Sequence, residues 1–340
     1  MSEDLNLDAL AAWMDGQGLG SDPITDCKRL TGGTQNILAR FTRAGRDYVL
    51  RRPPLHQRDN SNETMRREAR LLAALAGTDV PHPAFVGVCT DESVLGAVFY
   101  LMAPVEGFNP VSGLSDFHQT PAAQHRMGLA LVEGIAALGA VDYLAVGLEG
   151  FGKPDNYLER QVSRWKSQLA GYAEMPNWTG PQELPGVDKV AAWLEARRPK
   201  SFKPGIMHGD YHLANVMYRH DAPELAAIVD WELATIGDPL IDLGWLLATW
   251  PEPGAPSHLI SVQPWIGFPK AEELVAHYAA RSARDLSAME WYAVLACYKL
   301  GILLEGTHAR ACAGKAPRET GDLLHGRAIR LFERAGRWIG

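Results

Sequence analysis

The sequence predicts an α+β fold of two lobes, with a five-stranded antiparallel sheet and one helix in the small first lobe and mostly helices in the second. Two patterns lead to this prediction. Short β-type runs bounded by turn residues dominate the chain up to residue 102, and apolar residues recur at helical spacing through most of the remainder. Between them, residues 104–116 are rich in proline and glycine, as connections commonly are. We therefore expect an N-terminal lobe over 1–104 and a C-terminal lobe over 105–340.

The elements of the first lobe follow from local signals. An amphipathic pattern carries Leu10 and Trp13 toward a core. Ala44-Gly45 reads as the tight turn of a hairpin, and Pro53-Pro54 ends its second strand because proline cannot donate to a ladder. In chain order we expect a leading helix over 5–14, strands over 34–43 and 46–51, the helix of the lobe over 63–76, and strands over 85–89 and 97–102. These ranges account for four of the five strands expected in the sheet.

The second lobe has apolar residues at helical spacing in most of its length, interrupted by two segments with several prolines and tryptophans. Those two segments, 172–186 and 251–269, are expected to be loops. The expected helices cover 122–138, 156–170, 187–197, 238–248, 271–281, 288–305 and 321–338.

Composition excludes several classes of protein. The chain has 340 residues, is 46% hydrophobic and carries a net charge of −7, so it lacks the basic footprint of a nucleic-acid-binding protein. Its four cysteines form no C-x-x-C pair and read as reduced thiols, not metal ligands. The acidic N-terminus is unlike a secretory signal, and no run approaches the ~20 apolar residues of a membrane span. We expect a cytoplasmic protein that binds neither nucleic acid nor membrane.

Residues 206–232 carry the strongest functional signal. His208, Asp210 and Asn215 fit the pattern H-x-D-x-x-x-x-N, and Asp230 ends the apolar run 226–229. In phosphoryl transfer, an aspartate accepts the proton of a substrate hydroxyl, while an asparagine and a second aspartate bind Mg²⁺ on the phosphates of ATP. The pattern therefore predicts Asp210 as the catalytic base and Asn215 and Asp230 as the metal ligands.

Chance is the alternative explanation for this pattern. The bare motif arises in a chain of this length in roughly a few per cent of cases. Val229-Asp230-Trp231-Glu232 after a strand, followed by Asp238 and Asp242, occurs in the order that the mechanism requires and makes coincidence less plausible. Asp238 and Asp242 themselves read as helix-start acids that brace the catalytic loop.

Two histidines accompany the base. His208 is expected to position the loop more than to titrate. His212, two residues after Asp210, either steers the γ-phosphate or substrate, or only lines the site.

Two further groups are candidates for nucleotide binding. Gly32, Gly33, Thr34 and Asn36 stand where a glycine-rich loop would cover the phosphates, although an ordinary hairpin turn has the same composition. Arg51 occupies the place of the ATP-anchoring lysine of V-A-I-K kinases, with Glu68 on the next helix as its ion-pair partner. The alternatives are an exposed strand arginine and a solvated helix carboxylate, and strand alternation turns Arg52 to the opposite face.

The stretches HGDYHLANVM, IVDWELATIGDPLIDLGWLL and LTGGTQN resemble the aminoglycoside phosphotransferase-like kinase family. YVLRRPP, REARLLAALAGTDVPHP and YLERQVSRW are similar to the subfamily that some eukaryotes fuse to acyl-CoA dehydrogenases. The resemblance implies a bilobal protein-kinase-like fold, in which residues 1–104 form the nucleotide-binding lobe and residues 105–340 the catalytic and substrate-binding lobe. It implies ATP and Mg²⁺ as cofactors, and adenine bound by the backbone at Met102, Ala103 and Val105. It also implies a small-molecule substrate with a hydroxyl group and acyl-CoA-metabolising partner enzymes.

The sequence is compatible with several classes of substrate. Aromatic and basic residues in the 250–268 segment and the C-terminal helices suit a partly apolar, anionic acceptor such as a hydroxyacyl-CoA, although most of the aromatics also fit a helix core. An antibiotic phosphotransferase and a nucleotide-binding pseudokinase are the alternatives. These aromatic and basic residues are Trp250, Trp265, Phe268, Trp291, Tyr292, Lys299, His308 and Arg310.

Overall fold

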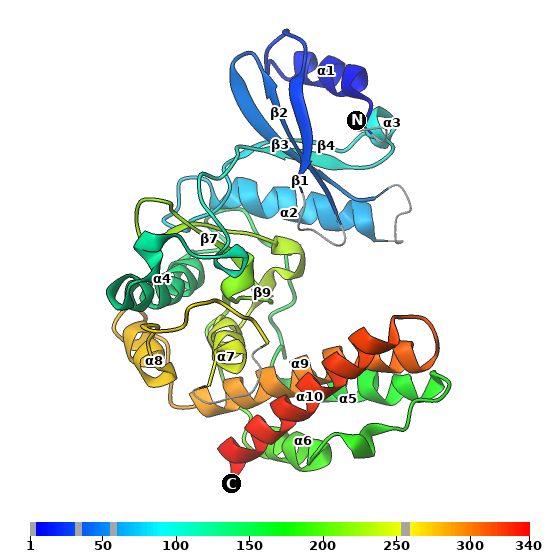
Figure 1. The fold of residues 1–340 in the computed structure, drawn as a ribbon, viewed down its shortest axis with the longest axis vertical. Coiled ribbons are helices and arrows are strands. Elements are labelled where there is room, and N and C mark those ends of the chain that lie inside the picture. The colour runs from blue at the N-terminus through cyan, green and yellow to red at the C-terminus, as the bar shows by residue number, and fades with distance from the viewer. Residues whose placement is uncertain (1–4, 31–35, 55–59, 253–258) are drawn as a thin grey trace. The chain divides into compact units, whose positions relative to one another are not determined.

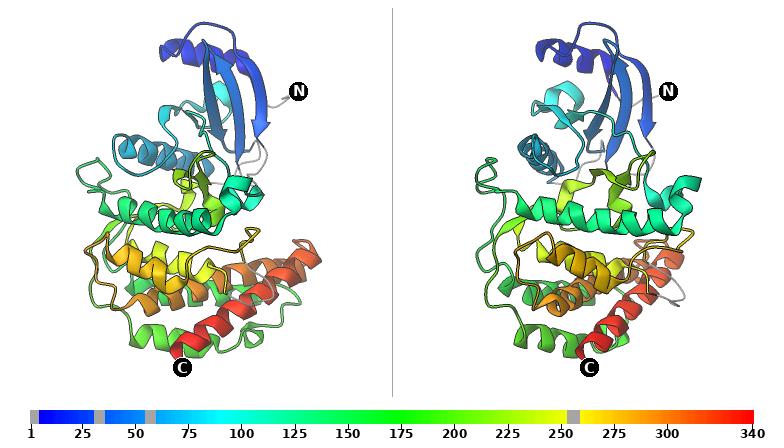
Figure 2. Two further views of the ribbon diagram at one scale, coloured as in Figure 1. Left: turned by 60° about the vertical axis from the view of Figure 1, so that its left-hand side comes forward. Right: turned by 90° about the vertical axis from the view of Figure 1, so that its left-hand side faces the viewer.

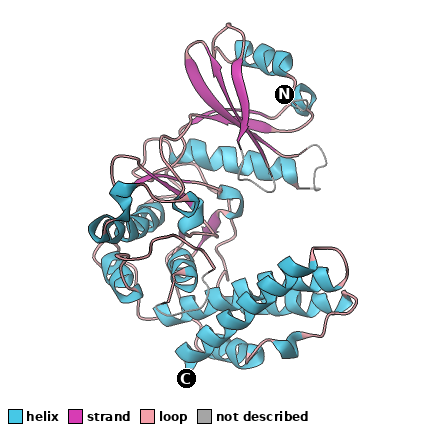
Figure 3. Ribbon diagram, viewed as in Figure 1, coloured by secondary structure: helices cyan, strands magenta, loops and turns pink. Residues whose placement is uncertain are grey.

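The computed structural model describes residues 5–30, 36–54, 60–252 and 259–340. The chain forms two compact units, each made of three stretches. The first unit comprises Met1–Phe108, Asp142–Phe151 and Val216–Ala234, and the second comprises Asn109–Val141, Gly152–Asn215 and Thr235–Gly340. The α+β fold class is confirmed, since the first unit contains a five-stranded antiparallel sheet and the second is mostly helical (Figure 3). The assignment of separate functions to residues on either side of 104 stays a prediction.

The sheet of the first unit has the strand order β1-β2-β3-β5-β4, and each neighbouring pair is antiparallel (Figure 1). The helix predicted between the hairpin and the last two strands is present as α2, and α1 and the one-turn α3 accompany it. The elements are α1 (Leu7–Gly16), β1 (Thr25–Leu30), β2 (Ile37–Arg43), β3 (Arg46–Arg52), α2 (Ser61–Leu75), β4 (Phe85–Cys89), α3 (Glu92–Leu95) and β5 (Phe99–Met102).

The β2–β3 hairpin is built as its sequence predicts. Ala44 and Gly45 both have positive φ, +49° and +69°, which is the backbone of a two-residue turn that matches the twist of paired strands. This turn sets the register, with Arg43 opposite Arg46. The strand ends at Arg52, directly before the two prolines.

The two faces of this sheet pack against different helices. Tyr48 and Leu50 of β3 lie in a buried apolar cluster with Leu10 and Met14 of α1. Helix α2 packs on β4 and β5. Because side chains alternate along a strand, Arg51 between Leu50 and Arg52 points away from the α1 cluster.

A second, two-stranded sheet completes the first unit. Strand β7 (Val216–Tyr218) pairs with β8 (Leu225–Ile228), and Tyr218 also bridges to Phe108. The N–H of Ile228 donates to the carbonyl of Pro81 at 2.8 Å. This bond fixes the end of β8, two residues before Asp230.

The second unit is organised around two largely buried helices, α7 (Leu240–Thr249) and α9 (Met289–Cys312), whose course Figure 2 shows in yellow and orange. Gly244 of α7 lies against the backbone of Tyr292, where a Cβ atom would overlap the Tyr292 carbonyl. No helix in the described ranges is long and apolar enough to cross a membrane. The elements are α4 (Pro121–Ala140), α5 (Glu159–Gly171), α6 (Val187–Ala196), β6 (Gly205–Met207), β9 (Thr235–Gly237), α7 (Leu240–Thr249), α8 (Ala271–Ala279), α9 (Met289–Cys312) and α10 (Arg318–Ile339).

Candidate active site

The loop that carries Asp210 begins where β6 pairs with β9, and a buried carboxylate fixes it there. Asp242, in the first turn of α7, accepts hydrogen bonds from the backbone N–H groups of His208 at 2.6 Å and Gly209 at 2.8 Å. Gly209 has φ +86°, which glycine adopts without strain. Burial raises the pKa of Asp242 to about 7, although the two N–H donors act to lower it. Asp242 therefore braces the loop, as its place in the sequence predicts.

The Asp210 carboxylate is oriented by three side chains. Trp245 Nε1 donates to its Oδ1 at 2.9 Å, and Asn215 Nδ2 donates to its Oδ2 at 3.0 Å. His212 Nε2 lies 3.2 Å from Oδ1. The side chain of Asp210 still keeps 30% of its surface exposed, which leaves room for a hydroxyl to approach.

Asp210 is ionised over the whole neutral pH range. Burial by itself raises its pKa, but the hydrogen bond and charge of His212, with the charges of His208 and Lys299, lower the pKa to about 2. A carboxylate with so low a pKa is a weak base. Such a group suits a loose transition state, in which it orients the nucleophile and receives the proton late.

The two histidines of the motif have different surroundings. His208 is fully buried, accepts the N–H of Asp210 on Nδ1 at 3.3 Å and meets the Tyr211 ring edge-on. His212 accepts the N–H of Ala214 on Nδ1 at 3.2 Å, so in the neutral tautomer its proton lies on Nε2, facing Asp210. His208 thus has the geometry of a positioning residue, and His212 that of a donor to Asp210.

Asn215 is held by both hydrogens of its amide. Nδ2 donates to the backbone carbonyl of Asp210 at 2.9 Å as well as to the carboxylate. Nearby, Asn109 donates to the carbonyl of Ala214 at 2.6 Å and fixes the same turn. Within the described part of the chain the amide oxygen of Asn215 accepts no hydrogen bond, so it is free to act as a ligand.

Two residues of this network were not assigned a catalytic role from the sequence. Trp245 comes from α7. Lys299, which was predicted from the sequence only as a substrate-side residue, comes from α9. Lys299 Nζ lies 4.3 Å from the centroid of the Trp245 ring and donates to the carbonyl of Gly209 at 3.1 Å. Burial lowers the pKa of Lys299 to about 8, against the pull of Asp210 and Asp242. The sequence signals available for these two residues were a tryptophan and a lysine within largely apolar helical segments.

In the first unit, Arg51 and Glu68 form the predicted ion pair. Arg51 Nε lies 3.0 Å from Glu68 Oε2, and Tyr100 donates its hydroxyl to the same oxygen at 2.8 Å. The Glu68 side chain is 1% exposed because helical spacing puts it on the face of α2 that also carries Met65 and Leu72. Arg52 instead donates to the carbonyls of Pro53 and Leu95, on the opposite face.

Asp230 joins this cluster from the segment after β8. Its Oδ1 accepts from Arg51 at 2.9 Å, and its side chain remains 42% exposed. The backbone of Asp230 has φ +65°, a left-handed conformation that is rare outside glycine and concentrates at functional sites. Arg67 donates to the carbonyl of Ala234 at 3.2 Å and ties the far end of the segment to α2.

The structure describes some of the remaining residues that were predicted to bind nucleotide. Met102 ends β5, and the N–H of Ala103 donates to the carbonyl of Ala84 at 2.8 Å, which leaves only its carbonyl for adenine. In the described ranges the N–H of Val105 has no hydrogen bond. Asn36 is half-buried directly before β2. Gly32, Gly33 and Thr34 lie outside the described residues.

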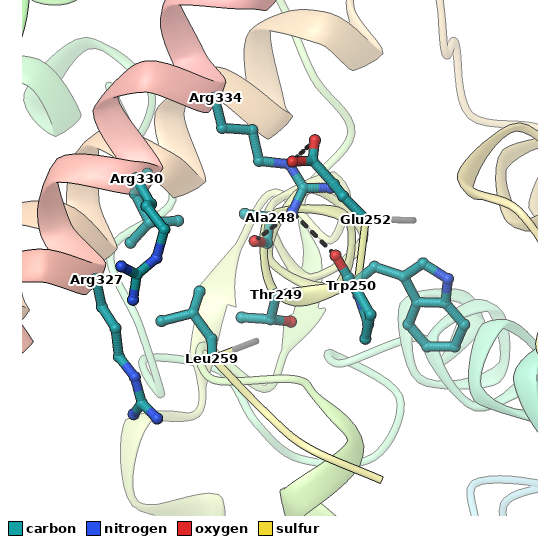
Figure 4. A pocket seen from close by; sticks show the side chains of 10 residues that line it. Ala248, Thr249, Trp250, Glu252, Leu259, Arg327, Arg330 and Arg334 are labelled. Atoms are coloured by element: carbon teal, nitrogen blue, oxygen red, sulfur yellow. Dashed lines mark hydrogen bonds and ion pairs between the residues drawn. The ribbon is translucent and has the colours of Figure 1, made fainter. Parts of the chain in front are cut away.

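A basic pocket lies between the end of α7 and α10 (Figure 4). Arg334 is engaged there by the carbonyls of Ala248 and Trp250, at 3.0 and 2.9 Å, and by the Glu252 carboxylate at 3.1 Å. Arg327 and Arg330 extend from the same face of α10, and neither has an acidic partner among the described residues (Figure 4).

An adjoining pocket of about 790 Å³ shares Trp250, Arg330 and Arg334 with the first. The rings of Trp265 and Phe268 stack at its edge with centroids 4.1 Å apart. Trp291 and Tyr292 are core residues instead, and Arg310 is exposed. Of the aromatics named from the sequence, Trp250, Trp265 and Phe268 therefore line a pocket.

Comparison with protein families gives one match that spans most of the chain. A family model described as the phosphotransferase enzyme family matches residues 26–292. Acyl-CoA dehydrogenase family member 10 of Mus musculus is 27% identical over 323 residues, covering 92% of this chain and 29% of the relative. Family member 11 of Rattus norvegicus is 29% identical over 317 residues, covering 89% of this chain and 39% of the relative. The chain thus spans less than half the length of these relatives.

Solved structures agree with the family match and confirm the protein-kinase-like fold. A candidate aminoglycoside phosphotransferase from Ralstonia eutropha superposes with a TM-score of 0.82 and 28% identity, covering 98% of both chains. The GDP and kanamycin complex of an aminoglycoside phosphotransferase gives a TM-score of 0.66 at 17% identity over 98% of this chain and 99% of that one. This second likeness concerns the fold alone.

Proposed function

The chain belongs to the phosphotransferase enzyme family, and from that premise we propose that it is an ATP- and Mg²⁺-dependent kinase that transfers the γ-phosphate to a substrate hydroxyl. One observation carries the proposal. The Asp210 carboxylate is ionised, oriented by Trp245, Asn215 and His212, and partly open to solvent. Such a group can hold a hydroxyl for in-line attack.

The residues around Asp210 divide the work of the transfer. Asp210 accepts the hydrogen bond of the acceptor hydroxyl and receives its proton as the new P–O bond forms. Trp245 and Asn215 keep the carboxylate from rotating. Lys299 adds a half-buried positive charge beside Gly209, which favours the ionised form of Asp210. His212 donates to Asp210 and is the nearest group that could relay the proton.

The oxygen donors present suit magnesium. Mg²⁺ prefers carboxylate and amide oxygens together with substrate phosphates. Asp230 offers a half-exposed carboxylate, and Asn215 offers an amide oxygen without a protein partner in the described ranges. When bound, the ion neutralises charge on the phosphates. Arg51, held by Glu68, places a fixed positive charge next to Asp230.

The acceptor we propose is a hydroxyacyl-CoA or a closely related hydroxylated acyl compound. Arg327 and Arg330 present positive charge without acidic partners in the described chain, and Trp265 and Phe268 offer flat apolar surface. Coenzyme A combines phosphates with an adenine ring, so both features match it, whereas a polycationic aminoglycoside would be repelled by the arginines. The acyl-CoA dehydrogenase names of the relatives support the same class, with acyl-CoA-metabolising enzymes as partners.

The test is Mg²⁺-dependent ADP release from ATP against hydroxyacyl-CoAs, the matching free hydroxy acids, aminoglycosides and macrolides. Turnover is expected with the CoA esters and not with the free acids. Arg330→Gln should raise KM for the CoA ester severalfold at unchanged kcat, while Arg310→Gln, an exposed control on α9, should change neither. Turnover with aminoglycosides alone would replace the acceptor class and leave the kinase intact. Failure to bind ATP with Mg²⁺ would overturn the kinase assignment.

Asp230→Asn separates metal binding from the transfer step. Loss of the carboxylate is expected to weaken Mg²⁺-dependent ATP binding by at least the roughly 10- to 100-fold that loss of a metal's outer-shell partner costs, with little effect on binding measured in excess EDTA. A titration of a fluorescent ATP analogue with and without Mg²⁺ measures this. Equal loss in both conditions would assign Asp230 a structural role.

A further inference from the structure

The hairpin of α9 and α10 carries a group of side chains that the phosphotransferase site does not use. Glu305 and His308 of α9 and His325 of α10 each have a ligand atom within 4.8 Å of the others. This is the one such group found in the described part of the chain. Cys312 adds a sulfur, with Sγ 3.5 Å from His308 Nε2.

The sequence brings these groups together through helical spacing. Glu305, His308 and Cys312 are separated by three and four residues, so they lie along one face of α9. Gly321 lets α10 return closely, because a Cβ there would overlap the side chain of Ala311. The next residues on α10, Asp322 and His325, then face His308.

The cluster contains a carboxylate that a bound cation would compensate. Glu305 is 1% exposed, and among the described residues it has no lysine or arginine within ion-pair distance. Its oxygens accept from Trp178 Nε1 at 2.6 Å and meet His325 Nδ1 at 2.7 Å. A buried carboxylate of this kind is costly unless a cation lies against it.

Among the described residues, one ring nitrogen of His308 also lacks a hydrogen-bond partner. Its Nδ1 is buried and makes no hydrogen bond within the described chain, and the nearest acid, Asp322 Oδ1, is 3.5 Å away. Its Nε2 faces the sulfur of Cys312. A histidine with a carboxylate behind one nitrogen and a metal on the other is a common arrangement in metal sites.

We infer that Glu305, His308, Cys312 and His325 form a zinc site that clips α9 to α10. Two imidazoles, a carboxylate and a thiolate are the donors that Zn²⁺ takes in closed four-coordinate sites. Asp322 would orient His308, and Trp178 would orient Glu305.

Binding has two structural consequences. The rings of His308 and His325, stacked with centroids 4.3 Å apart, must turn so that their nitrogens converge on the ion. Cys312 must release its proton to solvent. Arg318, whose guanidinium lies 3.5 Å from the sulfur, is neutralised by Asp322 at 3.0 Å and does not prevent binding. Nitrogen and sulfur donors exclude Mg²⁺, so this site is distinct from the magnesium of the proposed transfer.

The test uses the full chain stripped of metal with EDTA, without nucleotide. Isothermal titration with Zn²⁺ should show one equivalent bound per chain in the presence of excess Mg²⁺, and the midpoint of thermal unfolding should rise on binding. Outer-shell groups alone are worth about 10- to 100-fold in metal affinity, so His308→Gln and His325→Gln should each lose at least that much. His125→Gln, which removes an exposed histidine of α4, should leave binding unchanged.

Cobalt substitution identifies the ligands even if a variant is less stable. Co²⁺ should give visible bands with a sulfur-to-metal charge-transfer band, and Cys312→Ser should lose the charge-transfer band while keeping the visible bands. Circular dichroism confirms that each variant is folded. Absence of Zn²⁺ binding by the folded wild type, or undiminished binding by the folded His308→Gln and His325→Gln variants, would overturn the site.

Discussion

The two aspartates assigned to transfer and to metal binding are held by opposite kinds of contact. Asp210 is oriented mainly by neutral donors, Trp245 and Asn215. Asp230 is held by one permanent cation, Arg51, which it shares with Glu68. Neutral directional donors fix the angle of a carboxylate, whereas an ion pair fixes the local charge and lets the carboxylate exchange partners. The difference suits a group that must aim at a hydroxyl and one that must release its partner for a metal.

Asp210→Asn tests the first half of this contrast and should have the largest effect. The amide can still accept from Trp245, so the fold should persist, but it cannot take a proton. We expect kcat to fall by about 10²- to 10⁴-fold with ATP affinity unchanged. Steady-state kinetics and a nucleotide titration measure the two quantities. Asp221→Asn, at an exposed residue paired with Arg219, serves as the control.

Arg51→Met tests the second half. It leaves the buried Glu68 without a cation, and breaking a buried pair in this way costs about 3–5 kcal/mol of unfolding free energy. Urea denaturation should show this loss, and adding Glu68→Gln should recover part of it. Arg40→Met, which breaks an exposed pair with Asp47, should cost no more than about 1 kcal/mol. Equal losses in the two single variants would contradict the charge-based account of the cluster.

Trp245→Phe tests how much the hydrogen bond from Trp245 contributes to the orientation of Asp210. Phenylalanine keeps a ring beside Lys299 and removes only the Nε1 donor. A hydrogen bond to a charged group contributes about 1.5–3 kcal/mol, so kcat should fall by roughly tenfold to a hundredfold. Trp193→Phe is the matched control, because Nε1 of Trp193 has no partner in the described ranges. Unchanged kcat in Trp245→Phe would mean that the orientation of Asp210 rests on other groups.

The pH dependence of stability gives the smallest effect. The folded pKa of Asp210, about 2, lies below the ordinary value near 3.9, so its contribution is present above that value and is lost as the pH falls toward 2. Between about pH 5 and about pH 3 the wild type should lose about 1 kcal/mol more unfolding free energy than Asp210→Asn. Urea denaturation at the two pH values checks this. Parallel losses would show that the carboxylate is not held as described.

The parts of the site that could be predicted from the sequence are those formed by residues close together in the chain. The catalytic loop, the strand before Asp230 and the opposite faces of Arg51 and Arg52 follow from spacing and alternation within short segments. The Ala44-Gly45 turn follows from its composition in the same way. Each depends on neighbours only a few residues away, where backbone geometry determines what is possible.

The rest could not be read from the sequence because it depends on packing between distant segments. Trp245 contacts Asp210 and Lys299 contacts Gly209 from two different helices, and in the sequence both residues stand in ordinary helical patterns. The partners of His308 were equally hidden, since His325 lies on another helix whose angle of approach no local pattern encodes. The structure places Lys299 beside Gly209, and its predicted role on the substrate side stays a prediction.

The interleaved course of the chain affects how the protein must be made. Because the two units alternate along the sequence, the polypeptide passes from one to the other five times. Strands β7 and β8 belong to the first unit but are synthesised after the whole stretch Gly152–Asn215 of the second. On the ribosome the N-terminal sheet therefore cannot gain these partners until Ala234 has emerged. A nascent chain released at residue 108 would lack both Asp230 and its supporting strands, so the first unit is completed only late in translation.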